Sequence, residues 1–265
     1  MIEFILLVVL GALTGVMAGL LGIGGGLIVV PGLVFLLHWT SLPESIIMHV
    51  AAGTSLCIMI FTAWVSARAH HRHGHVDMSV FFTMLPTVLV GTVLGALLAT
   101  EIPGRWLGMI FGVFLLLNGI KLLYAKSKKS STHPTTHSAN WMRFLGALVG
   151  FPSGLLGVGG GFFTVPLLLH CGLEIQKAIG TSAILTLPIS MIGTAVFSVL
   201  GIHQVHYEGV IGYIYWPAVL VVVPVSMLLA PVGARWSTVL PTVVLRRAFA
   251  CFMLLVALQM LWKFV

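Results

Sequence analysis

The sequence has very few charged residues. Asp, Glu, Lys and Arg together make up 7% of its 265 residues, whereas soluble domains carry about 25%. Hydrophobic residues make up 59%, and the mean hydropathy is +1.13. This composition excludes a soluble enzyme and a nucleic-acid-binding domain, although the net charge is +7. We expect an all-α polytopic membrane protein whose outer surface lies against the lipid bilayer.

Acidic residues are absent from the middle of the apolar stretches. All six lie near the ends of these stretches or in loops: Glu3, Glu44, Asp77, Glu101, Glu174 and Glu208. Transporters that couple to protons or cations usually place such a group within the membrane. The sequence therefore disfavours a path for cations and contains no obvious proton relay.

Paired cysteines and nucleotide-binding motifs are also missing. Cys57, Cys171 and Cys251 lie far apart and form no CxxC pair, so neither a redox centre nor a zinc knuckle is indicated. The glycine clusters at Gly22–Gly26 and Gly157–Gly161 are not followed by the lysine of a P-loop. We therefore expect no cofactor and no bound metal.

A segment of thirteen residues occurs twice. Gly19–Pro31 returns as Gly154–Pro166 with nine identical positions. A second shared element follows in each half, where Ala51–Ser55 matches Ala178–Ser182 and both end in Gly-Thr-Ser. Gly95-Ala96 likewise matches Gly233-Ala234. The order of these elements predicts an internal duplication.

The duplication divides the chain into two repeats of about four helical segments. We expect the first repeat over 1–125 and the second over 141–265, joined by the polar, basic linker 126–140. Runs long enough to span a bilayer are Ile46–Val65, Val80–Ala99, Trp106–Tyr124, Ala178–Leu200, Val210–Ala230 and Val243–Leu261. The first segment of each repeat, Ile2–Leu37 or Trp141–Leu169, is too long or too interrupted for one helix, and we expect it to break at its glycines.

The distribution of Lys and Arg indicates how the repeats are oriented. If both broken segments cross the membrane, Lys and Arg are split 8 to 5 between the two faces. If both re-enter on the side where they start, the second repeat is inverted relative to the first. Eleven basic residues then lie on the face of the linker, and only Arg105 and Lys263 lie on the other. Because basic residues gather on the cytoplasmic side, this bias favours inverted repeats with a cytoplasmic linker.

The duplicated glycine clusters are the leading candidates for a binding site. A helix that restarts after such a break directs unpaired N–H groups and a positive dipole end at the break, and these bind anions without a basic side chain. Close helix packing is the alternative explanation for the glycines. We assign the site to both breaks: Gly22, Gly24, Gly25, Gly26, Gly157, Gly159, Gly160 and Gly161.

The Gly-Thr-Ser elements add hydroxyl groups to this candidate site. Thr54, Ser55, Thr181 and Ser182 have hydroxyls that either donate to an oxyanion or cap their own helices. With the glycines they form a neutral, donor-rich pocket that suits a small anion. His49 precedes the first element and is a candidate for a proton-linked role, with a packed histidine as the alternative.

A cluster of histidines offers a rival function. His70, His71, His73 and His75 lie close together with Asp77 nearby, as in a metal site. His203 and His206 lie in the matching loop of the other repeat, which faces the opposite side if the repeats are inverted. We therefore interpret His70–His75 as a solvated loop between two spans and keep a divalent metal-ion transporter as the alternative.

The duplicated motif resembles that of the TauE/SafE family of bacterial sulfite and organosulfonate exporters. The shared pattern is Gly-Leu-Leu-Gly-[Ile/Val]-Gly-Gly-Gly with a later Pro, followed in each half by Gly-Thr-Ser. The resemblance covers nearly the whole chain and implies a multi-pass protein of the bacterial inner membrane. It also implies export of sulfite, sulfoacetate or a related small anion, and leaves the exact anion open.

Taken together, these patterns predict a transporter and not an enzyme. A membrane enzyme would need a nucleophile with a partner, but Cys57 and His49 are eight residues apart on one helix, about 12 Å of rise. A non-enzymatic assembly partner would have no need for a duplicated anion pocket. The expected partners are a small anion and the bilayer, and the sequence leaves a homo-oligomer open.

Overall fold

The structure, a computed structural model, describes residues 2–21, 25–40, 42–124, 138–239 and 242–264. These residues form helices and one short β hairpin, which confirms an all-α membrane protein. The helices are α1 (Ile2–Leu21), α2 (Gly26–Leu37), α3 (Glu44–Arg72), α4 (Met78–Glu101), α5 (Gly104–Tyr124), α6 (Ala139–Leu156), α7 (Gly161–His170), α8 (Ile175–Gly201), α9 (Trp216–Val239) and α10 (Thr242–Phe264). The hairpin is β1 (Val210–Ile211) with β2 (Ile214–Tyr215).

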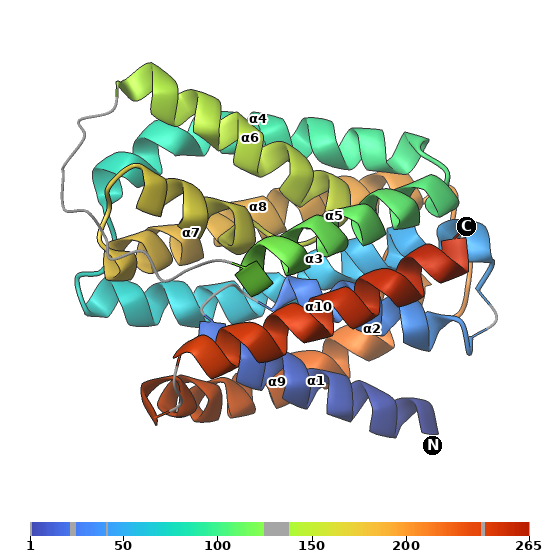
Figure 1. The fold of residues 1–265 in the computed structure, drawn as a ribbon. Helices are drawn as coiled ribbons and strands as arrows, with labels where there is room; N and C mark the ends of the chain where they lie inside the picture. The colour runs from blue at the N-terminus through green and yellow to red at the C-terminus, as the bar shows by residue number, and fades with distance from the viewer. Residues whose placement is uncertain (1, 22–24, 41, 125–137, 240–241, 265) are drawn as a thin grey trace.

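Two of the helices, α2 and α7, are about half as long as the others and fold back on the helices before them. A Cβ atom on Gly25, directly before α2, would lie 2.6 Å from Cγ2 of Thr14, and Gly32 of α2 packs on Leu10. In α7, the preceding Gly160 packs on Val149 of α6. The short helices lie toward opposite ends of the bundle (Figure 1).

The remaining helices pack in pairs that lie far apart in the sequence. Helix α4 packs along α6, α1 along α9, α5 along α10 and α3 along α8 (Figure 1). Glycines allow the closest of these approaches, since Gly150 of α6 lies against the backbone of Val88 and Gly15 of α1 against that of Ser226. Small residues at helix contacts are typical of packing inside membranes.

Three helices in the described part of the chain are long and apolar enough to cross a membrane by length and composition: α3, α4 and α8. Helix α3 is the most enclosed of these, because 83% of its apolar window is buried inside the protein. Helices α4 and α8 expose more apolar surface, including Phe82, Leu94 and Val199. Helix α3 therefore forms the centre of the bundle, and its side chains contact both glycine breaks.

Exposed tryptophans lie toward both ends of the bundle. Trp39 follows the end of α2 and Trp262 lies near the end of α10, and both are among the most exposed side chains. Trp64 in the second half of α3 and Trp141 at the start of α6 are about half exposed. The guanidinium of Arg68 lies 5.7 Å from the ring centre of Trp64. Tryptophan and basic residues of this kind are enriched where a membrane meets water.

The β hairpin corrects one sequence expectation. The apolar run that starts at Val210 was expected to be helical throughout, but residues 210–215 form two paired strands and α9 begins only at Trp216. Gly212 at the turn has φ 65°, which favours glycine. The phenol of Tyr215, at the end of the hairpin, donates a hydrogen bond to the carboxylate of Glu3.

Candidate functional site

The first break precedes α2. Gly25 adopts φ 79°, a left-handed conformation that favours glycine, and its carbonyl accepts hydrogen bonds from the N–H groups of Ile28 and Val29. The next residue, Gly26, begins the helix, so the first-turn N–H groups point back at the break. The predicted site residues Gly22 and Gly24 lie outside the described residues.

The second break separates α6 from α7. Helix α6 ends at Leu156, and Gly157 closes it by donating its N–H to the carbonyl of Ser153. Gly159 then adopts φ 74°, and α7 begins at Gly161. The predicted break therefore lies where the sequence indicated, with Gly160 directly before the new helix.

The two breaks meet at Met59 of α3. A Cβ atom on Gly26 would lie 2.6 Å from the Sδ of Met59, and a Cβ atom on Gly159 would lie 2.8 Å from it. Gly26 also faces the backbone carbonyl of Val158 in the second break. Met59 has no exposed surface. Its thioether thus occupies the space between two backbones that carry no side chains.

Two buried hydroxyls near the breaks have no hydrogen-bond partner within the described residues. They are Oγ1 of Thr14, whose methyl group packs against Gly25, and Oγ of Ser55. Ser55 lies on the same face of α3 as Met59, one turn before it, and both side chains have no exposed surface. Since buried hydroxyls are normally paired, these two are candidates to donate to a ligand.

The other predicted hydroxyls hold the backbone. Thr54 accepts a hydrogen bond from the N–H of Tyr215 at 2.8 Å, and Thr181 accepts one from the N–H of Asp77 at 2.9 Å. Ser182 donates to the carbonyl of Gly161 at 3.3 Å. Thr54 and Thr181 therefore anchor loops, and Ser182 supports the start of α7.

His49 lies away from the breaks, near the start of α3. Its Nε2 lies 3.0 Å from the carbonyl oxygens of both Ala99 and Ile102, so its N–H donates to the turn between α4 and α5. The ring also lies 5.3 Å from that of Tyr213 in the β hairpin. These contacts give His49 a structural role, and its proton-linked role stays a prediction.

The histidine cluster begins inside α3, which runs to Arg72, and not in a loop as expected. The ring centres of His70 and His73 lie 6.1 and 5.8 Å from that of His75. Nδ1 of His73 bonds to the carbonyl of Ala69. Among the described residues, no three His, Cys, Asp or Glu side chains are arranged to hold a metal ion.

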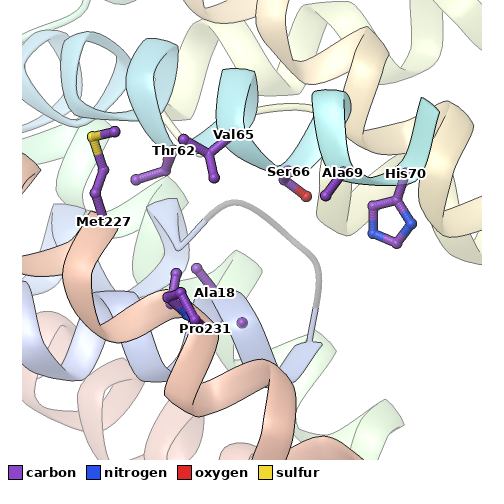
Figure 2. A pocket seen from close by; sticks show the side chains of 10 residues that line it. Ala18, Thr62, Val65, Ser66, Ala69, His70, Met227 and Pro231 are labelled. Atoms are coloured by element: carbon purple, nitrogen blue, oxygen red, sulfur yellow. The ribbon is translucent and has the colours of Figure 1, made fainter. Parts of the chain in front are cut away.

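A cavity of about 290 Å³ lies between α1, α3 and α9. Figure 2 shows Thr62, Ser66 and His70 along one wall, with Met227 and Pro231 opposite. The remaining lining is apolar. Thr62 lies one turn after Met59 on α3, and Ala18, which also lines the cavity, contacts Gly25. The cavity therefore extends from the His70 end of the bundle to the first break.

Comparison with known proteins decides the family. Residues 7–260 match the profile described as sulfite exporter TauE/SafE, which covers all of the geometry above. The chain belongs to the TauE/SafE family. It is thus a multi-pass membrane protein of a transporter family, as the duplicated motif predicted.

Curated relatives of this TauE/SafE member cover most or nearly all of its length. A probable membrane transporter protein of Haemophilus influenzae is 35% identical over 99% of this chain and 100% of its own. One from Bacillus subtilis is 28% identical over 98% of both chains. A third, from Methanocaldococcus jannaschii, is 28% identical over 82% of this chain and 79% of its own. Their names describe transporters and not enzymes.

Sequence reasoning missed two residues beside the breaks of this TauE/SafE protein, Thr14 and Met59. Both lie within long apolar runs. Thr14 is the first hydroxyl of its segment, which was a weak signal, and nothing in composition or spacing sets Met59 apart. The position of Met59 between the two breaks follows only from the fold, which packs both breaks against α3.

Proposed function

We propose that this TauE/SafE protein exports small sulfur-containing anions, such as sulfite, sulfoacetate or a related organosulfonate, from the cytoplasm. The bilayer it crosses would be the bacterial inner membrane. The observation that carries the proposal is the meeting of two glycine breaks beside the start of α2 and two unpaired hydroxyls. The family description, sulfite exporter, supports the substrate class.

The proposed site binds its anion through neutral donors. The start of α2 at Gly26 and Leu27 and the positive end of its dipole would face the anion, with hydroxyls from Thr14 and Ser55 beside them. Gly159 and Gly160 supply backbone from the second repeat. A site without a cationic side chain would bind an anion without holding it too firmly for release.

We further propose that the two repeats are inverted. Exchanging α1–α5 for α6–α10 largely preserves the packing: α4 on α6 corresponds to α9 on α1, and α2 on α3 corresponds to α7 on α8. The hydrogen bond from Tyr215 to Thr54 corresponds in the same way to the one from Asp77 to Thr181. Inverted repeats around a central site are typical of transporters that work by alternating access.

One difference between the repeats supports such alternation. Gly154 of α6 packs directly on the backbone of Thr92 in α4. The corresponding residues of the other pair, Gly19 and Ala230, line the cavity instead. The bundle is thus open beside His70, at the end that carries most of the basic residues, and closed at the matching place in the other repeat. We interpret this as a state open to the cytoplasm.

The membrane potential favours export of an anion. Moving one charge across 100 mV is worth about 2.3 kcal/mol, so a dianion leaving a negative interior gains roughly twice that. Export therefore needs no coupled ion, in keeping with spans that hold no carboxylate in their middle. Import of the same anion would need a coupled proton or cation, and no carboxylate lies in the middle of a span to bind one.

Efflux from proteoliposomes tests the proposal. Vesicles containing the purified protein are loaded with sulfite, sulfoacetate, thiosulfate, sulfate or Zn²⁺, and an inside-negative potential is imposed. We expect faster efflux of sulfite or sulfoacetate than from protein-free vesicles, and acceleration by the potential. Zn²⁺ flux without anion flux would overturn the proposal and favour the metal-ion alternative.

A further inference from the structure

Met59 lies between Ser55 and Thr62, which lines the cavity, along one face of α3. Its thioether lies between Gly26 and Gly159, where any added Cβ atom would collide with it. The cavity begins one turn further along α3, at Thr62, and Ser55 lies one turn before Met59 on the same face. An anion that enters the cavity beside His70 must therefore pass Met59 to reach Ser55.

The chemistry of methionine suits a movable barrier. Its unbranched side chain has three rotatable bonds and adapts to irregular space, unlike a β-branched or aromatic side chain. The cavity of about 290 Å³ begins at Thr62, one turn along α3 from Met59. Gly26 and Gly159 place no side chain of their own against the thioether, and Cγ2 of Thr186 also lies beside Gly159.

We propose that Met59 is the inner gate of the anion site, closed in this structure and displaced when an anion binds between the breaks. This inference rests on the proposed function for the identity of the anion. The gate itself follows from the position of the thioether between the cavity and Ser55. Met59 is a positioning residue that controls access, and it need not bind the anion.

The accessibility of introduced cysteines tests whether Met59 blocks the way to Ser55, and this test needs no transported anion. The native thiols are first removed by Cys57→Ala, Cys171→Ala and Cys251→Ala. A single cysteine is then introduced by Ser55→Cys, behind Met59, or by Ser66→Cys, in the wall of the cavity. The purified protein is treated with a charged methanethiosulfonate reagent, and the rate of labelling is measured for each position.

The gate predicts a contrast between the two positions. The thiol at position 66 should react quickly whether or not Met59 is present, whereas the thiol at position 55 should react slowly in its presence. Met59→Ala should then speed labelling at position 55 by about tenfold or more, a factor that corresponds to about 1.4 kcal/mol. Met59→Leu, which conserves volume, should leave labelling at position 55 slow.

Met48→Ala provides the matched control, because Met48 is also fully buried on α3 but does not lie between the breaks. It should cost similar stability and leave position 55 protected. Equal labelling of position 55 with and without Met59 would overturn the gate, as would equal acceleration by Met48→Ala. Since no anion takes part, a failure here is distinguishable from a failure of anion export in vesicles.

Discussion

The hydroxyl oxygen of Thr54 accepts a hydrogen bond from the backbone N–H of Tyr215, a residue 161 positions further along the chain. The neighbouring Gly53 lies against the carbonyl of Tyr213, so no side chain fits between α3 and this loop. Thr181 holds Asp77 in the same way, and Gly180 lies against the carbonyl of His75. Each Gly-Thr-Ser element thus anchors a loop from the other half of the chain.

Replacing either threonine by valine should destabilise the protein. Thr54→Val or Thr181→Val keeps the shape but leaves a backbone N–H of the anchored loop without its acceptor, at a cost of about 1–3 kcal/mol. Thermal unfolding in detergent measures the effect. The control is Thr83→Val, since that hydroxyl only donates to Ser79 in its own helix. Equal melting temperatures for all three variants would show that the anchors do not matter.

Two equivalent serines should respond in opposite ways to removal of the hydroxyl. Ser182→Ala removes the donor to Gly161 and should lower the melting temperature. Ser55→Ala removes a buried hydroxyl that has no partner within the described residues, so stability should be unchanged or higher. Thermal unfolding of the two variants without ligand checks this. A clear loss of stability in Ser55→Ala would mean that its hydroxyl is paired within the protein.

The proposed inverted arrangement predicts which loops share a face of the membrane. In a background without native cysteines, His73→Cys should be labelled by an impermeant reagent only from the cytoplasmic side. His203→Cys, in the loop between α8 and α9, should be labelled only from the opposite side. Intact cells and inverted vesicles give the two sides. Labelling of both positions from one side would contradict inverted repeats.

The exposed histidines should have little influence on anion export. His71→Gln combined with His73→Gln removes two members of the cluster. Neither residue lines the cavity, whereas His70 of the same cluster does. Because no metal-holding group exists among the described residues, we expect efflux of the anion within about twofold of wild type and no change on adding a chelator. Loss of transport restored by Zn²⁺ would favour the metal-ion alternative.

The sequence predicted the helices well because their length and apolar character are local properties. The breaks were predictable too, since clustered glycines such as Gly157 and Gly159 favour conformations that end a helix. The hairpin at residues 210–215 was not predictable from hydropathy, because a buried strand and a buried helix are equally apolar.

The site was predictable only in part, because the role of a side chain depends on what the fold brings to it. Thr54 and Ser55 are adjacent in the sequence, yet Thr54 anchors a loop while Ser55 has no partner in the described residues. That difference depends on Tyr215, far away in the chain. Met59 likewise acquires its position only from the meeting of Gly26 and Gly159.

Anion binding to purified protein tests the central claim most directly. Thermal shifts with sulfite, sulfoacetate, thiosulfate and sulfate are compared between wild type and the double variant Thr14→Val, Ser55→Ala, which removes the two unpaired hydroxyls beside the breaks. We predict that sulfite or sulfoacetate stabilises the wild type, and that the folded double variant loses this shift. A shift of equal size in both proteins, or none with any anion, would contradict an anion site between the breaks.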